Sequence, residues 1–392
     1  MRPLEGMRVL AVEQFGAGPY GTSFLADLGA EVIKIENPAT GGDSGRYTGP
    51  HLLGSADSEY FQSWNSGKRS ITLDLKSKSD REKFDKLVPT AAAVVNNLRG
   101  DQPAKLALDY AALRTLNPAV VCLHISAYGR DNERQAWPGY DYLMQAEAGL
   151  MSITGDPDAA PCRFGSSVVD CMTGLVGTVG LLSCIMRARQ TGRGCDVDAS
   201  LFDVALHQLS YTATWYLNHG DVTKRLPRSS HFAVAPVQTV PTADGWIFIM
   251  CMTQKFWISL VDELRLPALL EDPRFATAAL RMTNRAVLSE ILDGAFRQHS
   301  TKHWLSRLSG VLPVGPVNDV AEALRNPRLE ETGMVRAVKH PANPGLKLLS
   351  NPLKVDGVRP ECGVTASLGA DNEVLLTPSY AGVPTGAAHH ET

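Results

Sequence analysis

A cluster of glycines near the start of the chain is the first feature whose spacing suggests chemistry. Gly16-Ala17-Gly18-Pro19-Tyr20-Gly21 follows a β-prone run and opens a helical stretch, and Glu36 lies near the end of the next predicted strand. This G-x-G-x-x-G pattern is the fingerprint of a dinucleotide-binding turn. Pro19, however, is typical of the first turn of a helix, and such a turn would also explain this local sequence. Two interpretations stay open: an NAD-binding oxidoreductase, and a tight strand-to-helix turn at the edge of another active site.

A single aspartate, Asp170, is the second candidate. It follows the small residues Gly165-Ser166-Ser167 in the first turn of a helix predicted over residues 166–189. The positive end of the helix dipole favours a carboxylate at this point, and we expect it to stay ionised. A capping role and a catalytic role both fit the position, and the residue pattern alone favours the cap.

Histidine and cysteine residues do not form a convincing metal site. His299 and His303 lie four apart, but Ser300-Thr301 between them is typical of a helix cap, which would break their common face. The seven cysteines contain no Cys-x-x-Cys spacing, so we expect reduced thiols rather than disulfides or a zinc site. We therefore expect no metal.

The elements that would position these residues follow an α/β pattern. Strands predicted over residues 8–12 and 31–35 are joined by a helix over 20–28, and a unit of this length implies parallel strands in a doubly wound sheet. Further strands are predicted over residues 70–75, 93–96, 120–125 and 196–199. In the helix that contains Asp170, three glycines fall three apart and predict a face packed closely against another backbone: Gly174, Gly177 and Gly180.

The character of the sequence changes beyond about residue 225. Residues 237–240 and 246–250 flank an Asp244-Gly245 turn, which predicts a β-hairpin, and helical stretches follow to about residue 330. A second, smaller α+β domain is therefore predicted over residues 225–330.

The composition limits the class of protein. The chain has 392 residues with 38 basic and 41 acidic side chains, a net charge of −3, which gives no electrostatic footprint for nucleic acid or an anionic membrane. The longest apolar run, residues 174–186, is shorter than the roughly 20 residues that cross a bilayer. The first residues lack the apolar core of a secretory signal. We therefore expect a cytoplasmic enzyme with no nucleic-acid or membrane partner.

Several short segments occur in the order typical of one enzyme family. They are Leu4-Glu5-Gly6-Met7-Arg8-Val9-Leu10, Ala17-Gly18-Pro19, residues 28–36, residues 65–76, Gly139-Tyr140-Asp141, Thr191-Gly192-Arg193-Gly194 and Val314-Gly315-Pro316-Val317-Asn318. Over nearly its whole length, the chain resembles the class III CoA-transferases, a group that includes formyl-CoA transferase, carnitine CoA-transferase and, as a relative, alpha-methylacyl-CoA racemase. The resemblance implies a large Rossmann-like domain from residues 1–224 and 331–392, a small domain from 225–330, and an interlocked homodimer.

Matched by position, Asp170 becomes the nucleophile of a CoA-transferase. The resemblance implies that its carboxylate forms a mixed anhydride and then an aspartyl-CoA thioester. The racemase branch carries a histidine base where this chain has Tyr140, and a tyrosine with a pKa near 10 is a poor base at neutral pH. Transfer of CoA is therefore favoured, with acyl-CoA racemisation or epimerisation as the alternative and an NAD-binding oxidoreductase as the less favoured one.

The same matching implies the substrate site. CoA or an acyl-CoA is expected as substrate, with no permanently bound cofactor. Gly16, Ala17 and Tyr140 fall at substrate-binding positions. Because formyl-CoA transferase has a glutamine where this chain has Gly16, a larger acceptor is implied, such as a dicarboxylic or hydroxy acid, with succinyl-CoA or a similar donor. The residues at CoA-binding positions are Leu73, Lys76, Asn97, Leu98 and Lys105.

Overall fold

The computed structural model describes residues 2–360 and 363–377. The chain divides into two compact units. The first comprises Met1–Ala148, Phe164–Leu209 and the described part of Arg328–Thr392, and the second comprises Gly149–Arg163 and Ser210–Pro327. The second unit thus begins earlier in the chain than the expected limit at residue 225, and the domain limits taken from the resemblance stay a prediction.

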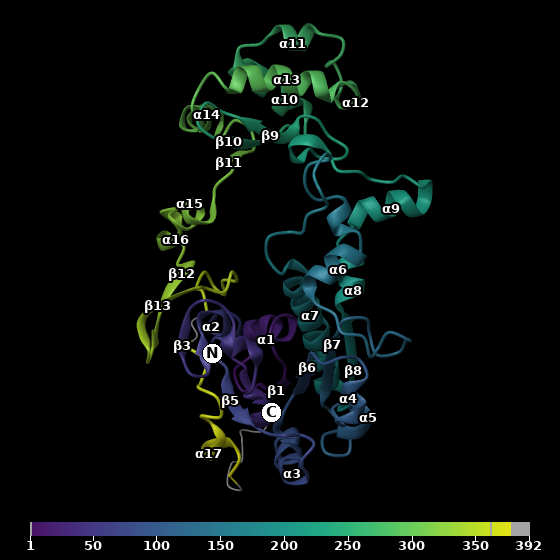
Figure 1. Cartoon of the computed structure of the whole chain (residues 1–392), viewed down its shortest axis with the longest axis vertical. Helices are drawn as coiled ribbons and strands as arrows, with labels where there is room; N and C mark the ends of the chain where they lie inside the picture. The colour runs from purple at the N-terminus through teal and green to yellow at the C-terminus, as the bar shows by residue number, and fades with distance from the viewer. Residues whose placement is uncertain (1, 361–362, 378–392) are drawn as a thin grey trace, which may run out of the picture. The chain divides into compact units, whose positions relative to one another are not determined.

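The first unit is organised around a parallel sheet. Its six strands lie in the order β5-β2-β1-β6-β7-β8, and each neighbouring pair is parallel (Figure 1). The predicted parallel α/β sheet is confirmed, with strand limits close to those expected. The strands are β1 (Arg8–Val12), β2 (Glu31–Glu36), β5 (Arg69–Thr72), β6 (Ala93–Asn96), β7 (Val121–Ser126) and β8 (Cys195–Ser200).

Helices cover both faces of this sheet. Phe84 of α3 (Lys78–Leu87) packs in the same buried cluster as Cys122 of β7. Helix α7 (Val168–Thr191) lies against Leu123, the next residue of that strand. Because successive side chains of a strand point to opposite faces, α3 and α7 lie on opposite sides of the sheet. All six residues of β7 are buried, as expected for a strand covered on both faces.

The strand order creates a switch point beside β1. The chain runs from β1 to β2 on one side, whereas β6 adds to the other side of β1. In open α/β sheets, ligands bind beyond the carboxyl ends of the strands at such a point. The segments that follow Val12 in β1 and Asn96 in β6 therefore flank the expected binding crevice.

The glycine-containing helix α7 packs closely against α1 (Ala17–Asp27). A Cβ at Gly174 would lie 2.5 Å from the carbonyl oxygen of Ala17, and a Cβ at Gly21 would lie 2.5 Å from the carbonyl oxygen of Gly174. The predicted close approach of a second backbone is confirmed for Gly174. The other two glycines of the predicted face contact side chains of β7 and β8 instead.

Helix α7 also corrects an expectation. Among the described residues, it is the one helix long and apolar enough, by length and composition, to cross a membrane. The expectation that no segment reaches that length is therefore wrong. In this structure one face of α7 packs on α1, β7 and β8, and Val169, Leu181 and Ile185 of that helix are buried.

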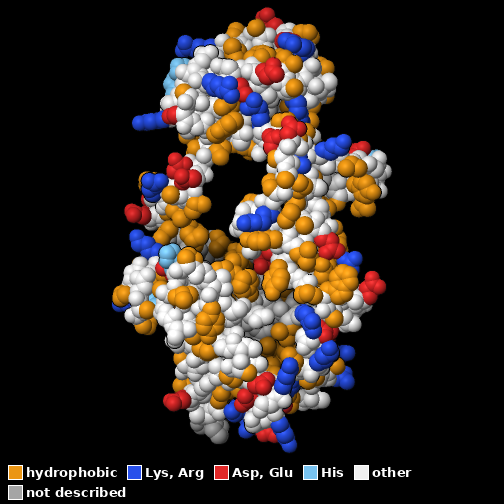
Figure 2. All heavy atoms as spheres, viewed as in Figure 1, with side chains coloured by type: hydrophobic (Ala, Val, Ile, Leu, Met, Phe, Trp, Pro, Cys, Tyr) orange, Lys and Arg blue, Asp and Glu red, His pale blue; other side chains and the backbone are white. Residues whose placement is uncertain are grey.

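The remaining elements of the first unit surround the sheet. On the face shown in Figure 2, both basic and acidic side chains of this unit are exposed. The whole chain has a net charge of −3. These elements are β3 (Leu52–Gly54), β4 (Asp57–Ser58), α2 (Glu59–Asn65), α4 (Gln102–Lys105), α5 (Tyr110–Leu113), α6 (Asp141–Glu147), α8 (Leu201–His207), α16 (Arg328–Glu331), β12 (Val335–His340), β13 (Asn343–Leu349) and α17 (Asn372–Leu375).

The second unit contains the predicted hairpin. Strand β9 (Val237–Pro241) pairs antiparallel with β10 (Trp246–Met250), which also pairs with β11 (Val314–Pro316). Large apolar side chains, among them Trp257 and Phe296, are buried in its core. Its helices are α9 (Ser210–His219), α10 (Gln254–Leu264), α11 (Ala268–Glu271), α12 (Ala278–Thr283), α13 (Arg285–Phe296), α14 (Thr301–Leu308) and α15 (Val320–Leu324).

The contact between α1 and α7 predicts how two glycine substitutions differ. Gly174→Ala is expected to destabilise the first unit by about 1–3 kcal/mol, although alanine favours helix, because the new Cβ meets backbone that cannot move aside. Gly177→Ala is the matched control in the same helix, since its Cβ would meet only methyl ends of Leu123 and Ile125 at 3.3–3.4 Å. Urea unfolding measures both variants, and equal stabilities would contradict the close backbone contact.

Candidate active site

A cavity of about 340 Å³ lies at the switch point of the sheet, within the first unit. The segments after β1 and β6, the end of β7 and the first turn of α7 form most of its wall. It therefore occupies the place where the topology leads us to expect a ligand. The cavity brings together the predicted site residues Gly16, Ala17, Asn97, Leu98, Tyr140 and Asp170.

The main chain of Asp170 is held by a second carboxylate. Asp170 lies in the first turn of α7 and is 9% exposed. Its N–H donates to Oδ2 of Asp141 at 2.9 Å, and Gln145 Nε2 donates to the other oxygen of Asp141 at 2.5 Å. Asp141, from the start of α6, thus accepts a hydrogen bond from a free N–H group in the first turn of α7, as a capping side chain would. The side chain of Asp170 is therefore not the cap.

The environment of Asp170 favours its protonated form. Burial is the larger cause and the negative charge of Asp141 the second, and together they raise the pKa of Asp170 from 3.8 to about 7. The expectation that the helix dipole keeps this carboxylate ionised is therefore wrong near neutral pH, because desolvation and a like charge outweigh the dipole. A carboxylate that titrates near pH 7 suits nucleophilic or proton-transfer chemistry.

Gly16 allows the turn between β1 and α1 to approach this carboxylate. A Cβ at Gly16 would lie 2.7 Å from Cγ of Asp170, far inside van der Waals contact. The preceding residue, Phe15, has a φ of 66°, in the left-handed region that bulky residues rarely adopt. Strain of this kind is typical of functional sites.

The other glycines of the G-x-G-x-x-G pattern also face atoms of the chain itself. A Cβ at Gly18 would lie 3.0 Å from Cγ of Asn97, and one at Gly21 would meet the carbonyl oxygen of Gly174. All three glycines of the pattern therefore make room for neighbouring parts of the first unit. A tight turn at the edge of an active site accounts for the pattern.

Aromatic side chains gather beside the nucleophile. The ring centroid of Phe15 lies 5.2 Å from that of Tyr60 and 6.5 Å from that of Tyr140. Burial is the larger cause and the charge of Asp170 the second by which the pKa of the Tyr60 phenol is raised. Tyr60 is therefore a neutral side chain beside the nucleophile. Tyr140 is 69% exposed, which leaves its ring accessible to a ligand.

Three predicted CoA-binding residues do not line the cavity. Leu73 is 1% exposed and packs in the core on the α3 side of the sheet. Lys76 is exposed after β5. Lys105 is also exposed, and its Nζ lies 2.6 Å from Oδ2 of Asp101, the atom that also accepts a hydrogen bond from Gln102 of the cavity wall at 2.7 Å. The two lysines stay predicted CoA contacts.

The sequence alone assigns no role to three further residues at this site, Asp141, Arg99 and Gln102. Arg99 and Gln102 follow the carboxyl end of β6. Because ligands bind beyond the carboxyl ends of the strands at a switch point, the position of these two residues could have indicated them. Asp141 is part of a segment that carried the resemblance, but no spacing indicates its contact with a residue 29 positions away. Its effect on Asp170 arises only in the fold.

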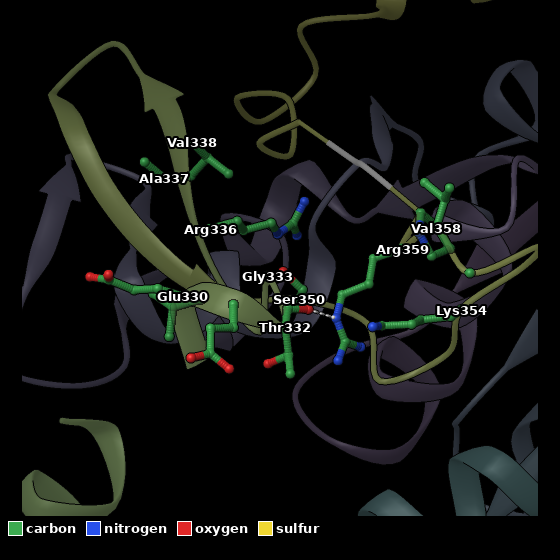
Figure 3. A pocket seen from close by; sticks show the side chains of 14 residues that line it. Glu330, Thr332, Gly333, Arg336, Ala337, Val338, Ser350, Lys354, Val358 and Arg359 are labelled. Atoms are coloured by element: carbon green, nitrogen blue, oxygen red, sulfur yellow. Dashed lines mark hydrogen bonds between the residues drawn. The ribbon is translucent and has the colours of Figure 1, made fainter. Parts of the chain in front are cut away.

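A second cavity, of about 610 Å³, lies beside β12 in the C-terminal part of the first unit (Figure 3). Arg359 Nε and Nη1 donate to the carbonyl oxygens of Thr332 at 2.7 Å and Asn351 at 2.8 Å. None of the predicted site residues lines this cavity. Across residues 2–360 and 363–377, no three His, Cys, Asp or Glu side chains gather as metal ligands would.

The raised pKa predicts a pH-dependent effect of Asp170→Asn on stability. The folded-state pKa of about 7 lies above the ordinary value of 3.8, so ionisation of Asp170 costs stability increasingly as the pH rises between these values. The variant removes that cost. Its Tm should exceed that of the wild type at pH 8, and the difference should shrink towards pH 5. Scanning calorimetry measures the Tm of the wild type and of the variant at each pH. A Tm difference that does not depend on pH would contradict the raised pKa.

Known proteins are similar to this chain over most of its length. The family model described as CoA-transferase family III matches residues 4–372. The chain is 33% identical to the succinate–glutarate CoA-transferase of Agrobacterium fabrum, over 92% of this chain and 93% of that protein. It is 32% identical to the succinyl-CoA:mesaconate CoA-transferase of Haloarcula hispanica, over 100% of both.

A solved structure of a related protein is also similar to this chain. The crystal structure of a CaiB/BaiF family protein from Brucella suis matches with a TM-score of 0.82 and 32% identity, over 95% of this chain and 98% of that one. The resemblance predicted from short segments is confirmed: the chain belongs to CoA-transferase family III and is an enzyme of that class.

Proposed function

We propose that this enzyme transfers CoA from an acyl-CoA donor to a carboxylic acid through Asp170. The observation that carries the proposal is a buried carboxylate with a pKa of about 7, facing the backbone at Gly16 in the switch-point cavity. The names of the relatives refer to succinate, glutarate and mesaconate, which are dicarboxylic acids. They support a dicarboxylic acceptor with succinyl-CoA or a similar donor.

The first half of the reaction moves CoA onto the enzyme. A carboxylate oxygen of Asp170 attacks the thioester carbonyl, and the C–S bond breaks with its electron pair on sulfur, which leaves an acyl-aspartyl anhydride and the CoA thiolate. The thiolate then attacks the aspartyl carbonyl of the anhydride. This step forms an aspartyl-CoA thioester and releases the donor acid as a carboxylate.

The second half repeats these steps in reverse with the acceptor acid. The acceptor carboxylate attacks the aspartyl thioester, which gives a new anhydride and again frees the thiolate. The thiolate attacks the acceptor's acyl carbon, so the new acyl-CoA leaves and the Asp170 carboxylate is restored. In the complete reaction, the thioester of the donor is replaced by a thioester of the acceptor, so no ATP is needed.

The surroundings of Asp170 support this chemistry. A carboxylate whose pKa is raised to about 7 is more basic than a solvated one, and nucleophilicity rises with basicity. The burial of Asp170, which is 9% exposed, also limits the access of water to an anhydride at this residue. The cap residue of α1, Gly16, offers no side chain to the N–H groups of the first turn, which leaves them for the charge that develops on the thioester oxygen.

We place CoA along the β6 side of the cavity. Asn97 and Leu98 line this side, and Arg99 follows them. Arg99 Nε lies 3.3 Å from Oδ1 of Asp101, and Lys105 Nζ lies 2.6 Å from Oδ2 of the same side chain. Arg99 in the cavity wall and the exposed Lys105 beside it are two basic groups that support binding of the CoA phosphates on this side.

We also propose that the enzyme is a cytoplasmic homodimer. The outer face of α7 supports a second copy as partner, because Val176, Val179 and Met186 are 46%, 66% and 65% exposed. An apolar surface of this kind on one helix is typical of a protein interface.

A covalent CoA adduct on Asp170 is the direct test of the proposal. After incubation with succinyl-CoA, mass spectrometry of peptides should find CoA on Asp170. Asp170→Ala should lower transfer at least ~10³-fold, because no other Asp or Glu is among the described residues that line the cavity. An unmodified Asp170 together with an active Asp170→Ala would contradict the proposal. Exchange of the α-hydrogen in deuterated water without any acceptor acid would instead support racemisation.

The pH profile tests the electrostatic role of Asp141. In the wild type, kcat/KM for acyl-CoA should fall on the acid side as Asp170 is protonated, with a midpoint near the pKa of about 7. Asp141→Asn removes the like charge and keeps an oxygen for the Asp170 N–H. Its midpoint should move to lower pH, because the remaining cause of the raised pKa is burial. A midpoint that does not move would show that Asp141 does not set this pKa.

A further inference from the structure

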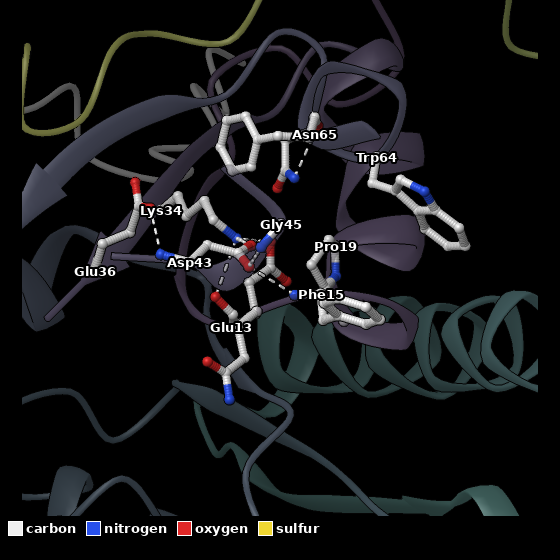
Figure 4. Close-up of polar contacts among 12 residues, drawn as sticks. Glu13, Phe15, Pro19, Lys34, Glu36, Asp43, Gly45, Trp64 and Asn65 are labelled. Atoms are coloured by element: carbon white, nitrogen blue, oxygen red, sulfur yellow. Dashed lines mark hydrogen bonds and ion pairs between the residues drawn. The ribbon is translucent and has the colours of Figure 1, made fainter. Parts of the chain in front are cut away.

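A cluster of buried charges next to the β1–α1 turn has no part in the steps described so far. It consists of Glu13, Lys34 and Asp43 (Figure 4) together with Lys68. The side chains of all four are at most 1% exposed. Lys34 Nζ lies 2.8 Å from Oδ2 of Asp43, and Lys68 Nζ lies 2.7 Å from Oε1 of Glu13. Buried ion pairs are often no more stabilising than apolar packing, so stability alone is a weak reason for four such charges.

Two members of the cluster hold both ends of the turn. Lys34 Nζ donates to the carbonyl oxygen of Glu13 at 3.0 Å, and the N–H of Phe15 donates to Oδ1 of Asp43 at 2.9 Å. The same oxygen of Asp43 accepts the N–H of Gly45 at 2.8 Å. Because Lys34 and Asp43 are themselves paired, the turn and the two side chains form a closed loop of contacts.

A further side chain completes the support of the turn. Asn97 accepts the N–H of Gln14 at Oδ1 at 2.9 Å and donates from Nδ2 to the carbonyl oxygen of Gln14 at 2.6 Å. Both peptide groups between Glu13 and Phe15 are therefore bound by side chains. A turn tethered in this way has little freedom to relax.

Phe15 is the residue that requires these tethers. Its φ of 66° is unfavourable for a phenylalanine and persists only where the surroundings hold it. In this conformation the chain continues to Gly16, which faces the carboxylate of Asp170. Loss of the Phe15 contact would let the turn relax and would move Gly16 away from the nucleophile.

Asp43 is the suitable acceptor for this task because it stays ionised. Burial acts to raise its pKa, but the charge of Lys34 and the N–H groups of Gly45 and Phe15 outweigh burial and lower the pKa. Its own N–H donates to Oε1 of Glu36 at 3.0 Å. Hydrogen bonds to an ionised acceptor are stronger than those to a neutral one, so Asp43 holds the Phe15 N–H firmly.

We propose that Asp43, held in place by Lys34, is a positioning residue for CoA transfer that fixes the Phe15–Gly16 turn against Asp170. The inference rests on the proposed role of Asp170 as nucleophile. Asp43 touches none of the reacting atoms, and its effect is on the alignment of the turn with the nucleophile, on which rate depends steeply. Its loss should therefore lower kcat more than it raises KM for acyl-CoA.

A matched pair of double variants separates positioning from structural support. Lys34→Met/Asp43→Asn and Lys34→Met/Asp43→Leu both remove the ion pair without leaving one of these charges unpaired. Asparagine keeps an oxygen for the Phe15 N–H, whereas leucine has none. We expect kcat to be at least about 10-fold lower with leucine than with asparagine, and KM to differ by less than about 3-fold. Hydrogen exchange should be faster with leucine in residues 13–17.

The wild type distinguishes a failure of this inference from a failure of the proposed function. Absence of CoA transfer in the wild type would refute the proposed function. With an active wild type, equal kcat and equal exchange in the two double variants would overturn the inference. Should the leucine variant not fold, Asp43→Glu takes its place, because it keeps the charge opposite Lys34 but displaces the acceptor oxygen. Wild-type kcat in Asp43→Glu would then overturn the inference.

Discussion

The close contact between the backbones of α1 and α7 is the constraint on which the active site depends. The carbonyl oxygen of Gly174 lies where a side chain at Gly21 would have to stand, so the two helices pack at a distance that only glycine permits. At the start of the two helices, the same approach brings Gly16, the cap residue of α1, to the carboxyl group of Asp170 in the first turn of α7. The nucleophile is therefore placed by packing over the length of two helices, before any hydrogen bond of its own is considered.

Two buried aspartates of the first unit show how neighbours set the role of a residue type. Burial acts on both in the same direction. Asp43 faces Lys34 and two N–H groups, which lower its pKa in spite of burial, whereas Asp170 faces Asp141, which adds to burial and raises its pKa to about 7. The first is a fixed anion that holds backbone, and the second is a reactive group that titrates near neutrality.

The sequence predicted the framework better than the electrostatics. Periodicity and turn residues were sufficient for the single strands, for α7 and for the β9–β10 hairpin, because these depend on neighbours in the chain. The short strand–helix–strand spacing then implied parallel pairing of the strands. The environment of Asp170 was predicted wrongly, since the helix dipole is a local property whereas Asp141 and burial arise in the fold. The tethers of the Phe15 turn join residues up to 83 positions apart, and no spacing in the sequence indicates them.

The G-x-G-x-x-G pattern was ambiguous for a physical reason. In a dinucleotide-binding turn, glycines let a phosphate approach the start of a helix. Here the group that lies beside the start of α1, next to Gly16, is the carboxyl group of Asp170, a part of the same chain. Glu36, the expected partner of a ribose, is 3% exposed and pairs with Arg46 at 2.7 Å, so it is engaged inside the protein. The glycines of the pattern indicate that some group approaches the start of a helix closely, and the fold determines that these groups belong to the chain itself.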